Sequence, residues 1–118
     1  VTSALIDEVV FAAQQYQAAA PAIPVTDTVK VAVNGVVEST PERSKLFAVQ
    51  TPQVFDAELL KASLQDALRA NASLTDDCSA VERFGKEVRL TEGDAENIKI
   101  TKPLDLIVAE AILQSRGE

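Results

Sequence analysis

The sequence predicts an α/β fold in which helices are layered on a mixed β-sheet that carries an inserted β-hairpin. Segments with helical spacing of apolar residues alternate along the chain with short apolar segments typical of strands. In TVKVAVNGVVES, residues 28–39, valines alternate around Asn34-Gly35, the pair typical of a type I′ hairpin turn. A chain of 118 residues with 47% hydrophobic composition can form one domain with its own core.

The first expected element is an amphipathic helix that begins near Thr2 or Ser3 and ends at Pro21 at the latest. A short extended segment at residues 22–25 precedes the hairpin. A two-stranded hairpin is marginally stable alone, so this one must pack on its own domain or project onto a partner. The stripe of the helix predicted to be buried consists of Leu5, Ile6, Val9, Val10 and Ala13.

The rest of the chain is expected to alternate strands and helices. Each helix has a recognisable start, either an Asp or Thr cap or a proline in the first turn. The final helix is expected to bury Leu104, Ile107, Val108, Ala111 and Ile112. In order, the elements are a buried strand at 46–49, a helix at 57–70 capped by Asp56, a short helix from Thr75 or Asp76 to Gly85, strands at 88–90 and 97–101, and a helix from Pro103.

The segment Gln50-Thr51-Pro52-Gln53 interrupts this pattern between two apolar segments. It contains none of the Gly, Asn or Asp residues that usually form turns, which suggests a site. Ligands of α/β sheets bind at the carboxyl ends of strands. Thr51 follows one predicted strand and Lys99 lies near the end of another, while Thr28 lies at the base of the hairpin and Arg43 on its return.

These four residues supply two hydroxyls and two cations, a set that suits a phosphate group. In a chain of net charge −7, an anionic ligand needs such a local concentration of positive charge. The alternative is that Arg43 and Lys99 are ordinary surface charges and that Thr51 packs beside Pro52.

Composition excludes several classes of function. The sequence contains no His, which excludes His acid–base chemistry and His metal sites, and the net charge argues against nucleic-acid binding through a basic surface. The lone Cys78 fits a reducing, cytoplasmic compartment, and no membrane-spanning segment is expected. Asp76 and Asp77 could suggest a metal pair, but at a helix start we interpret them as a cap and a dipole partner. The acidic segment Glu92–Glu96 is interpreted as a solvated turn.

Four strings taken together resemble one family, the 2-C-methyl-D-erythritol 4-phosphate cytidylyltransferases of non-mevalonate isoprenoid biosynthesis. They are AIPVTDTVK, TPERSKLFAVQTPQVF, LTDDCSAVE and EGDAENIKITKPLDLIVAEAIL, and they cover essentially the whole chain in order. The family enzyme is about twice this long. The resemblance therefore implies that residues 1–118 are the C-terminal, substrate-binding and dimerisation half of a single Rossmann-like nucleotidyltransferase domain, with a hairpin arm at about 28–45. The absence of Met from the sequence agrees with that expectation.

The resemblance also implies roles for the candidate site residues. Thr28 and Thr51 look like the substrate-contacting threonines, Lys99 like a catalytic lysine near the phosphates, and Arg43 like a catalytic and substrate-binding arginine that crosses from the arm to the neighbouring subunit. We infer that the side chains of Gln50 and Gln53 hold the loop by hydrogen bonds.

The implied reaction is transfer of CMP from CTP to 2-C-methyl-D-erythritol 4-phosphate, with a divalent metal, normally Mg²⁺, and release of diphosphate. The implied assembly is a homodimer through the hairpin arm, and the present chain alone is expected to be inactive. Two alternatives stay open at this point. One is a pentitol-phosphate cytidylyltransferase, such as one for ribitol 5-phosphate, and the other is a non-catalytic dimerisation fragment.

Overall fold

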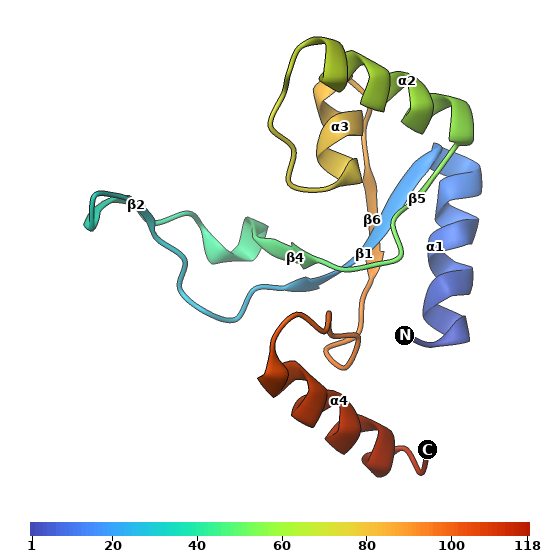
Figure 1. Cartoon of the computed structure of the whole chain (residues 1–118), viewed down its shortest axis with the longest axis vertical. Helices are drawn as coiled ribbons and strands as arrows, with labels where there is room; N and C mark the ends of the chain where they lie inside the picture. The colour runs from blue at the N-terminus through green and yellow to red at the C-terminus, as the bar shows by residue number, and fades with distance from the viewer.

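The computed structural model describes all 118 residues as an α/β fold with a mixed sheet, as predicted (Figure 1). Helix α1, Ser3–Tyr16, begins at Thr2, whose side-chain oxygen accepts a hydrogen bond from the Leu5 N–H at 3.3 Å. The helix ends at Gln17, which has a left-handed backbone with φ of 72°. It therefore stops before the predicted limit at Pro21. Its buried residues are Leu5, Val9, Ala12 and Ala13, whereas Ile6 and Val10 are each 37% exposed.

Strand β1, Ala18–Pro24, is the centre of the sheet and begins earlier than the extended segment predicted at residues 22–25. It pairs in parallel with β6, Arg89–Glu92, and antiparallel with both β4, Phe47–Val49, and β5, Val54–Phe55. Ala18, Ala19 and Ala20 are completely buried. Three small side chains in a row allow helix α1 to approach the strand closely, and a run of alanines carries no strand signal of its own.

Helices α2, Ala57–Arg69, and α3, Asp77–Arg83, lie side by side at one end of the sheet (Figure 1). The predicted caps are confirmed, because the Asp56 carboxylate accepts from the Leu59 N–H at 3.0 Å and Asp76 forms a capping box with Ser79. The segment after α3 turns at Gly85 in a left-handed conformation, with φ of 94°, as expected for a glycine that follows a helix.

The predicted hairpin consists of β2, Val31–Val33, and β3, Val36–Ser39, joined by Asn34 and Gly35 with φ of 51° and 78°. Every residue of both strands is exposed. Figure 1 shows the hairpin projecting away from the sheet, so within this chain it is an arm rather than a layer of the core.

Three further expectations are wrong in this chain. Strand β4 is exposed rather than buried, because it lies at the sheet edge and nothing in the chain covers it. Residues 97–101 form no strand, although Ile98 and Ile100 alternate with Lys99, because no neighbouring strand pairs with them. Helix α4, Pro103–Ser115, contains no buried residue and lies apart from the sheet in Figure 1, so no part of this chain covers its apolar stripe.

No helix of the chain is both long and apolar enough to span a bilayer.

Candidate binding site at the Gln50–Gln53 loop

The Gln50–Gln53 loop bulges out between two strands that pair with the same neighbour. Val49 lies opposite Ala22 and Val54 opposite Ala19, so four residues of the loop face two residues of β1. The Pro21 carbonyl accepts a hydrogen bond from the Gln50 N–H at 2.8 Å. Pro21 has no N–H that could donate a hydrogen bond back to the loop. At this residue β1 therefore cannot continue the backbone hydrogen bonding that it forms with β4 and β5. The loop can therefore leave the sheet without breaking a bond.

The two glutamines of the loop hold it from both sides, which confirms the inference from the sequence. The Gln50 side chain donates to the Asp94 carbonyl at 2.7 Å and accepts from the Asp94 N–H at 3.1 Å. The Gln53 side chain donates to the Asp76 carboxylate at 3.1 Å and accepts from the Cys78 N–H at 3.2 Å. Thr51 is thereby presented between two anchored residues, with its side chain exposed.

A cleft of about 750 Å³ opens beside this loop, a volume typical of small-molecule sites. It brings Thr51 and Lys99 together, as predicted, with the Asn97 side chain donating to the Thr51 carbonyl at 2.8 Å. The start of α3 supplies Thr75, Asp76 and Asp77 to its wall. Thr75 is not among the site residues predicted from the sequence, although a hydroxyl beside a helix cap is a signal that could have identified it.

The other two candidates, Thr28 and Arg43, do not line this cleft. Arg43 lies in a 3-10 turn, Arg43–Lys45, and its guanidinium donates to the Thr26 carbonyl at 3.1 Å. Both residues are exposed, near the base of the arm. Within one copy of this chain, therefore, two of the four predicted residues meet and two lie elsewhere.

The side chains of the cleft do not form a metal site. No group of three His, Cys, Asp or Glu residues in the chain is placed to hold an ion. The carboxylate of Asp76 is already hydrogen-bonded to the Ser79 N–H and to Gln53. This is the structural role as a cap that the sequence predicted, so Asp76 is committed to the fold rather than to a metal ion.

Two further features bear on the chemistry near the cleft. Burial and the neighbouring carboxylates, Asp76 first, raise the pKa of the Cys78 thiol to about 12, so the thiol stays protonated and is a poor nucleophile.

The acidic segment Glu92–Glu96 is more than a solvated turn, because Asp94 and Glu96 both form ion pairs with Arg116.

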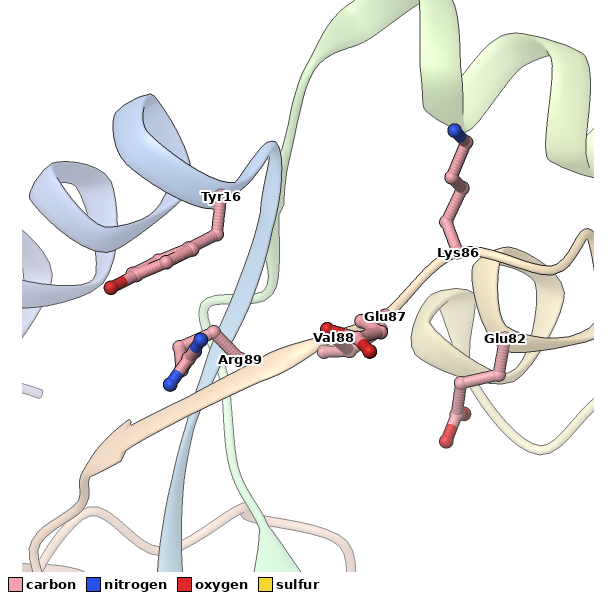
Figure 2. A pocket seen from close by; sticks show the side chains of 6 residues that line it. All are labelled: Tyr16, Glu82, Lys86, Glu87, Val88 and Arg89. Atoms are coloured by element: carbon pink, nitrogen blue, oxygen red, sulfur yellow. The ribbon is translucent and has the colours of Figure 1, made fainter.

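A second cavity of about 510 Å³ lies at the amino end of β6, whereas the first cleft lies beyond its carboxyl end. Figure 2 shows the Arg89 guanidinium over the Tyr16 ring, 4.0 Å from the ring centre. The charged residues of this cavity are two acids, Glu82 and Glu87, and two bases, Lys86 and Arg89. Because α/β folds bind ligands at the carboxyl ends of strands, and because only the first cleft contains residues predicted to bind a ligand, the first cleft is the candidate site.

Comparison with known proteins agrees with this fold. Residues 1–115 match the family model described as 2-C-methyl-D-erythritol 4-phosphate cytidylyltransferase. The protein of that name from Geobacillus kaustophilus is 52% identical over 111 residues, which cover 94% of this chain and 49% of the relative. The one from Desulforamulus reducens is 48% identical over 118 residues, covering 99% of this chain and 50% of the relative.

Solved structures give the same result. The crystal structure of 2-C-methyl-D-erythritol 4-phosphate cytidylyltransferase from Thermus thermophilus has a TM-score of 0.85 and 37% identity, covering 97% of this chain and 56% of that one. The Francisella tularensis structure of that name has a TM-score of 0.86 and 30% identity, covering 94% of this chain and 53% of that one. The chain spans about half the length of the relatives it matches. Because the family model covers nearly all of the chain and the solved structures superpose on it with TM-scores of 0.85 and 0.86, the chain belongs to the 2-C-methyl-D-erythritol 4-phosphate cytidylyltransferase family.

Proposed function

We propose that this chain forms the acceptor-substrate half of a cytoplasmic enzyme that transfers CMP from CTP to 2-C-methyl-D-erythritol 4-phosphate. The observation that carries the proposal is the cleft in which Thr51 and Lys99 meet, in a chain of this family. The hydroxyl of Thr51 offers a neutral donor and Lys99 a compact positive charge, and both suit a phosphate.

In the proposed reaction, a phosphate oxygen of the acceptor attacks the α-phosphorus of CTP. A new P–O bond forms as the bond to the β-phosphate breaks, and diphosphate leaves. Such transfers depend on alignment and on neutralisation of charge more than on covalent help from the protein. Thr51 would hold the acceptor phosphate, and Lys99 would stabilise charge on the transferring phosphates. Any Mg²⁺ would be held chiefly by the phosphates of the nucleotide, since Mg²⁺ in such sites takes only one or two carboxylates from the protein.

We further propose that the enzyme is a homodimer and that the hairpin arm reaches the second copy. Val31, Val33, Val36 and Val37 of the arm are each 43 to 69% exposed, and the exposure of such an apolar surface to water is unfavourable. Arg43 and Thr28 lie at the base of this arm and outside their own cleft. An arm that crosses a two-fold axis would bring both residues to the partner's cleft.

Two alternatives are less well supported. The relatives described above are all named for the methylerythritol substrate, which disfavours a pentitol-phosphate enzyme. The cleft with its anchored loop disfavours a fragment that serves dimerisation alone.

The test is substitution in the complete enzyme. Thr51→Ala and Lys99→Ala should each lower kcat/KM by the equivalent of about 2–4 kcal/mol, as expected for loss of a donor to a reacting phosphate. The melting temperature should stay near that of the wild type, because both side chains are exposed. Lys61→Ala, an exposed lysine of α2, is the matched control and should leave both quantities unchanged.

Wild-type kcat/KM in both variants would show that the site is wrong. A large drop in melting temperature would show instead that the two residues serve the fold. A competition between methylerythritol phosphate and ribitol phosphate for the same enzyme would identify the acceptor.

A further inference from the structure

Lys99 lies in a segment without regular secondary structure that is attached at both ends by side-chain hydrogen bonds. On its amino-terminal side, Asn97 donates to the Thr51 carbonyl at 2.8 Å. On its carboxyl-terminal side, the Asp105 carboxylate accepts from the backbone N–H groups of Thr101 at 3.0 Å and Lys102 at 2.8 Å. The position of Lys99 relative to Thr51 therefore depends on how these two attachments are held.

The loop before this segment is fixed against the sheet. The Gly93 N–H donates to the Ala22 carbonyl at 2.9 Å, and the Gln50 carboxamide forms its two hydrogen bonds to Asp94. A Cβ atom at Gly93 would lie 2.9 Å from the Ala22 carbonyl group and 2.5 Å from the Gln50 Oε1. Only glycine permits this close approach of the loop backbone to β1, so residue 93 fixes the position of the loop against the sheet.

Arg116 connects that loop to the far end of helix α4. It is the residue at which the helix ends, and its Nε lies 3.0 Å from the Glu96 Oε1 and its Nη2 3.9 Å from the Asp94 Oδ2. The Arg116 side chain is only 24% exposed. Helix α4 has no buried residue of its own, so within this chain Arg116 ties its carboxyl-terminal end to the cleft.

We propose that Arg116 is a positioning residue for the cleft, which acts through Asp94 and Glu96 on the separation of Lys99 and Thr51. Helix α4 is then held at two points, by Asp105 near its start and by Arg116 at its end, and the Lys99 segment is set between the helix and the Gln50 loop. This inference rests on the proposed roles of Lys99 and Thr51. Partly exposed ion pairs contribute little to stability, whereas a displacement of about 1 Å at a reacting centre can cost about 100-fold in rate. Substitution of Arg116 should therefore lower the activity more than it lowers the stability of the fold.

The first test is Arg116→Gln in the complete enzyme. We expect kcat/KM for the acceptor to fall roughly 10- to 100-fold, with a melting temperature close to that of the wild type. Arg116→Lys keeps the charge and should recover part of the loss. Arg83→Gln is the matched control, because Arg83 forms an ion pair with Asp66 between α3 and α2, away from the loop. If Arg116→Gln fails to fold, Glu96→Gln takes its place in both tests. It weakens the Arg116–Glu96 ion pair, the shorter of the two contacts of Arg116, and leaves Arg116 unchanged.

The second test does not depend on activity. Backbone hydrogen exchange of residues 94–101 should become faster in Arg116→Gln and stay unchanged in Arg83→Gln. Unchanged exchange in that segment would overturn the proposal, and so would faster exchange with no loss of kcat/KM. A wild-type kcat/KM in Lys99→Ala would refute the proposed function instead, while the exchange result would still decide whether Arg116 holds the loop.

Discussion

Helices α2 and α4 are both 13 residues long and begin with well-defined caps, but their surroundings differ completely. Helix α2 buries Ser63 and Ala67 against its neighbour α3, and its exposed large apolar residues are Leu64 and Leu68. Helix α4 exposes Leu104, Leu106 and Ile107 by at least 60% each. Because a helix that is apolar on several sides is normally covered, the comparison indicates that the α2–α3 region is complete within this chain and that α4 is not.

The hairpin arm shares this property with α4. Both regions carry apolar side chains that the chain itself does not cover, and each is connected to a predicted site residue, Arg43 for the arm and Lys99 for α4. The start of α3 forms part of the wall of the cleft, whereas the arm and α4 contribute no residue to it within this chain.

The largest expected effect concerns the arm and uses a mixed dimer of complete subunits. One subunit carries Arg43→Ala and the other Lys99→Ala, and each homodimer should be nearly inactive. If Arg43 acts in the partner's cleft, both defects fall in one site of the heterodimer and the other site is intact. Mixing should then restore up to about half of the wild-type activity, as expected for independent sites across a two-fold interface.

No recovery of activity, with the heterodimer confirmed by differential tagging, would place Arg43 in its own subunit's site. The proposed role of the arm in the partner's site would then be wrong, although its valines would still be exposed within this chain.

A smaller effect compares the two helices directly. Ala67 is 3% exposed beneath α3, so Ala67→Leu should overpack the contact and lower the free energy of unfolding by about 1–3 kcal/mol. Ile107 is 65% exposed on α4, so Ile107→Ala should change stability by less than about 0.5 kcal/mol in the 118-residue chain. Urea unfolding in this chain and in the complete protein measures both.

The same Ile107→Ala change sharpens the comparison in the complete protein. If α4 is covered there, the cost should rise to about 2 kcal/mol or more, as for a buried isoleucine. Leu68→Ala, on the outer side of α2 and 82% exposed, is the control and should be neutral in both proteins. Equal and small effects of Ile107→Ala in both would mean that α4 stays uncovered.

Local signals predicted most of the elements, because they depend on neighbouring residues. Caps at Asp56 and Asp76 and the Asn34-Gly35 turn form wherever the chain is free to adopt them. The place that a segment takes in the sheet, by contrast, depends on residues that are far from it in the sequence. Ala18–Ala20 is the buried centre of a strand because β5 and β6 pair with it and α1 packs on it, and residues 97–101 lack a strand partner despite their alternation.

The site was predictable to a similar extent. Thr51 follows β4 as predicted, whereas Lys99 lies in an irregular segment after β6 and meets Thr51 because the carboxyl ends of β4 and β6 lie at the same level of β1. The contacts that Gln50 makes, and the roles of Gly93 and Arg116, were not visible, because they join residues far apart in the sequence.

The smallest expected effect tests how α4 begins. Three hydrogen bonds, from the Thr101 and Lys102 backbone N–H groups and the Thr101 hydroxyl, lower the pKa of the Asp105 carboxyl below its ordinary value. A group whose pKa is lower in the folded state contributes stability that is fully present above its unfolded pKa and is lost as the pH falls through its folded pKa. The Asp105 contribution should therefore be constant at neutral pH and disappear only below about pH 4.

Asp105→Asn should remove this acid-dependent contribution and leave α2 unaffected. Carboxyl NMR titration of the wild type should give an Asp105 pKa below the value of about 3.9 that is typical of an unperturbed aspartate. Thermal melts of both proteins should converge as the pH is lowered below about 4, because the wild-type carboxyl is then protonated and no longer binds the three donors as an anion. An unshifted Asp105 pKa would mean that the Asp105 carboxylate does not fix the start of α4, and that Arg116 is then the main attachment of this helix to the loop that precedes Lys99.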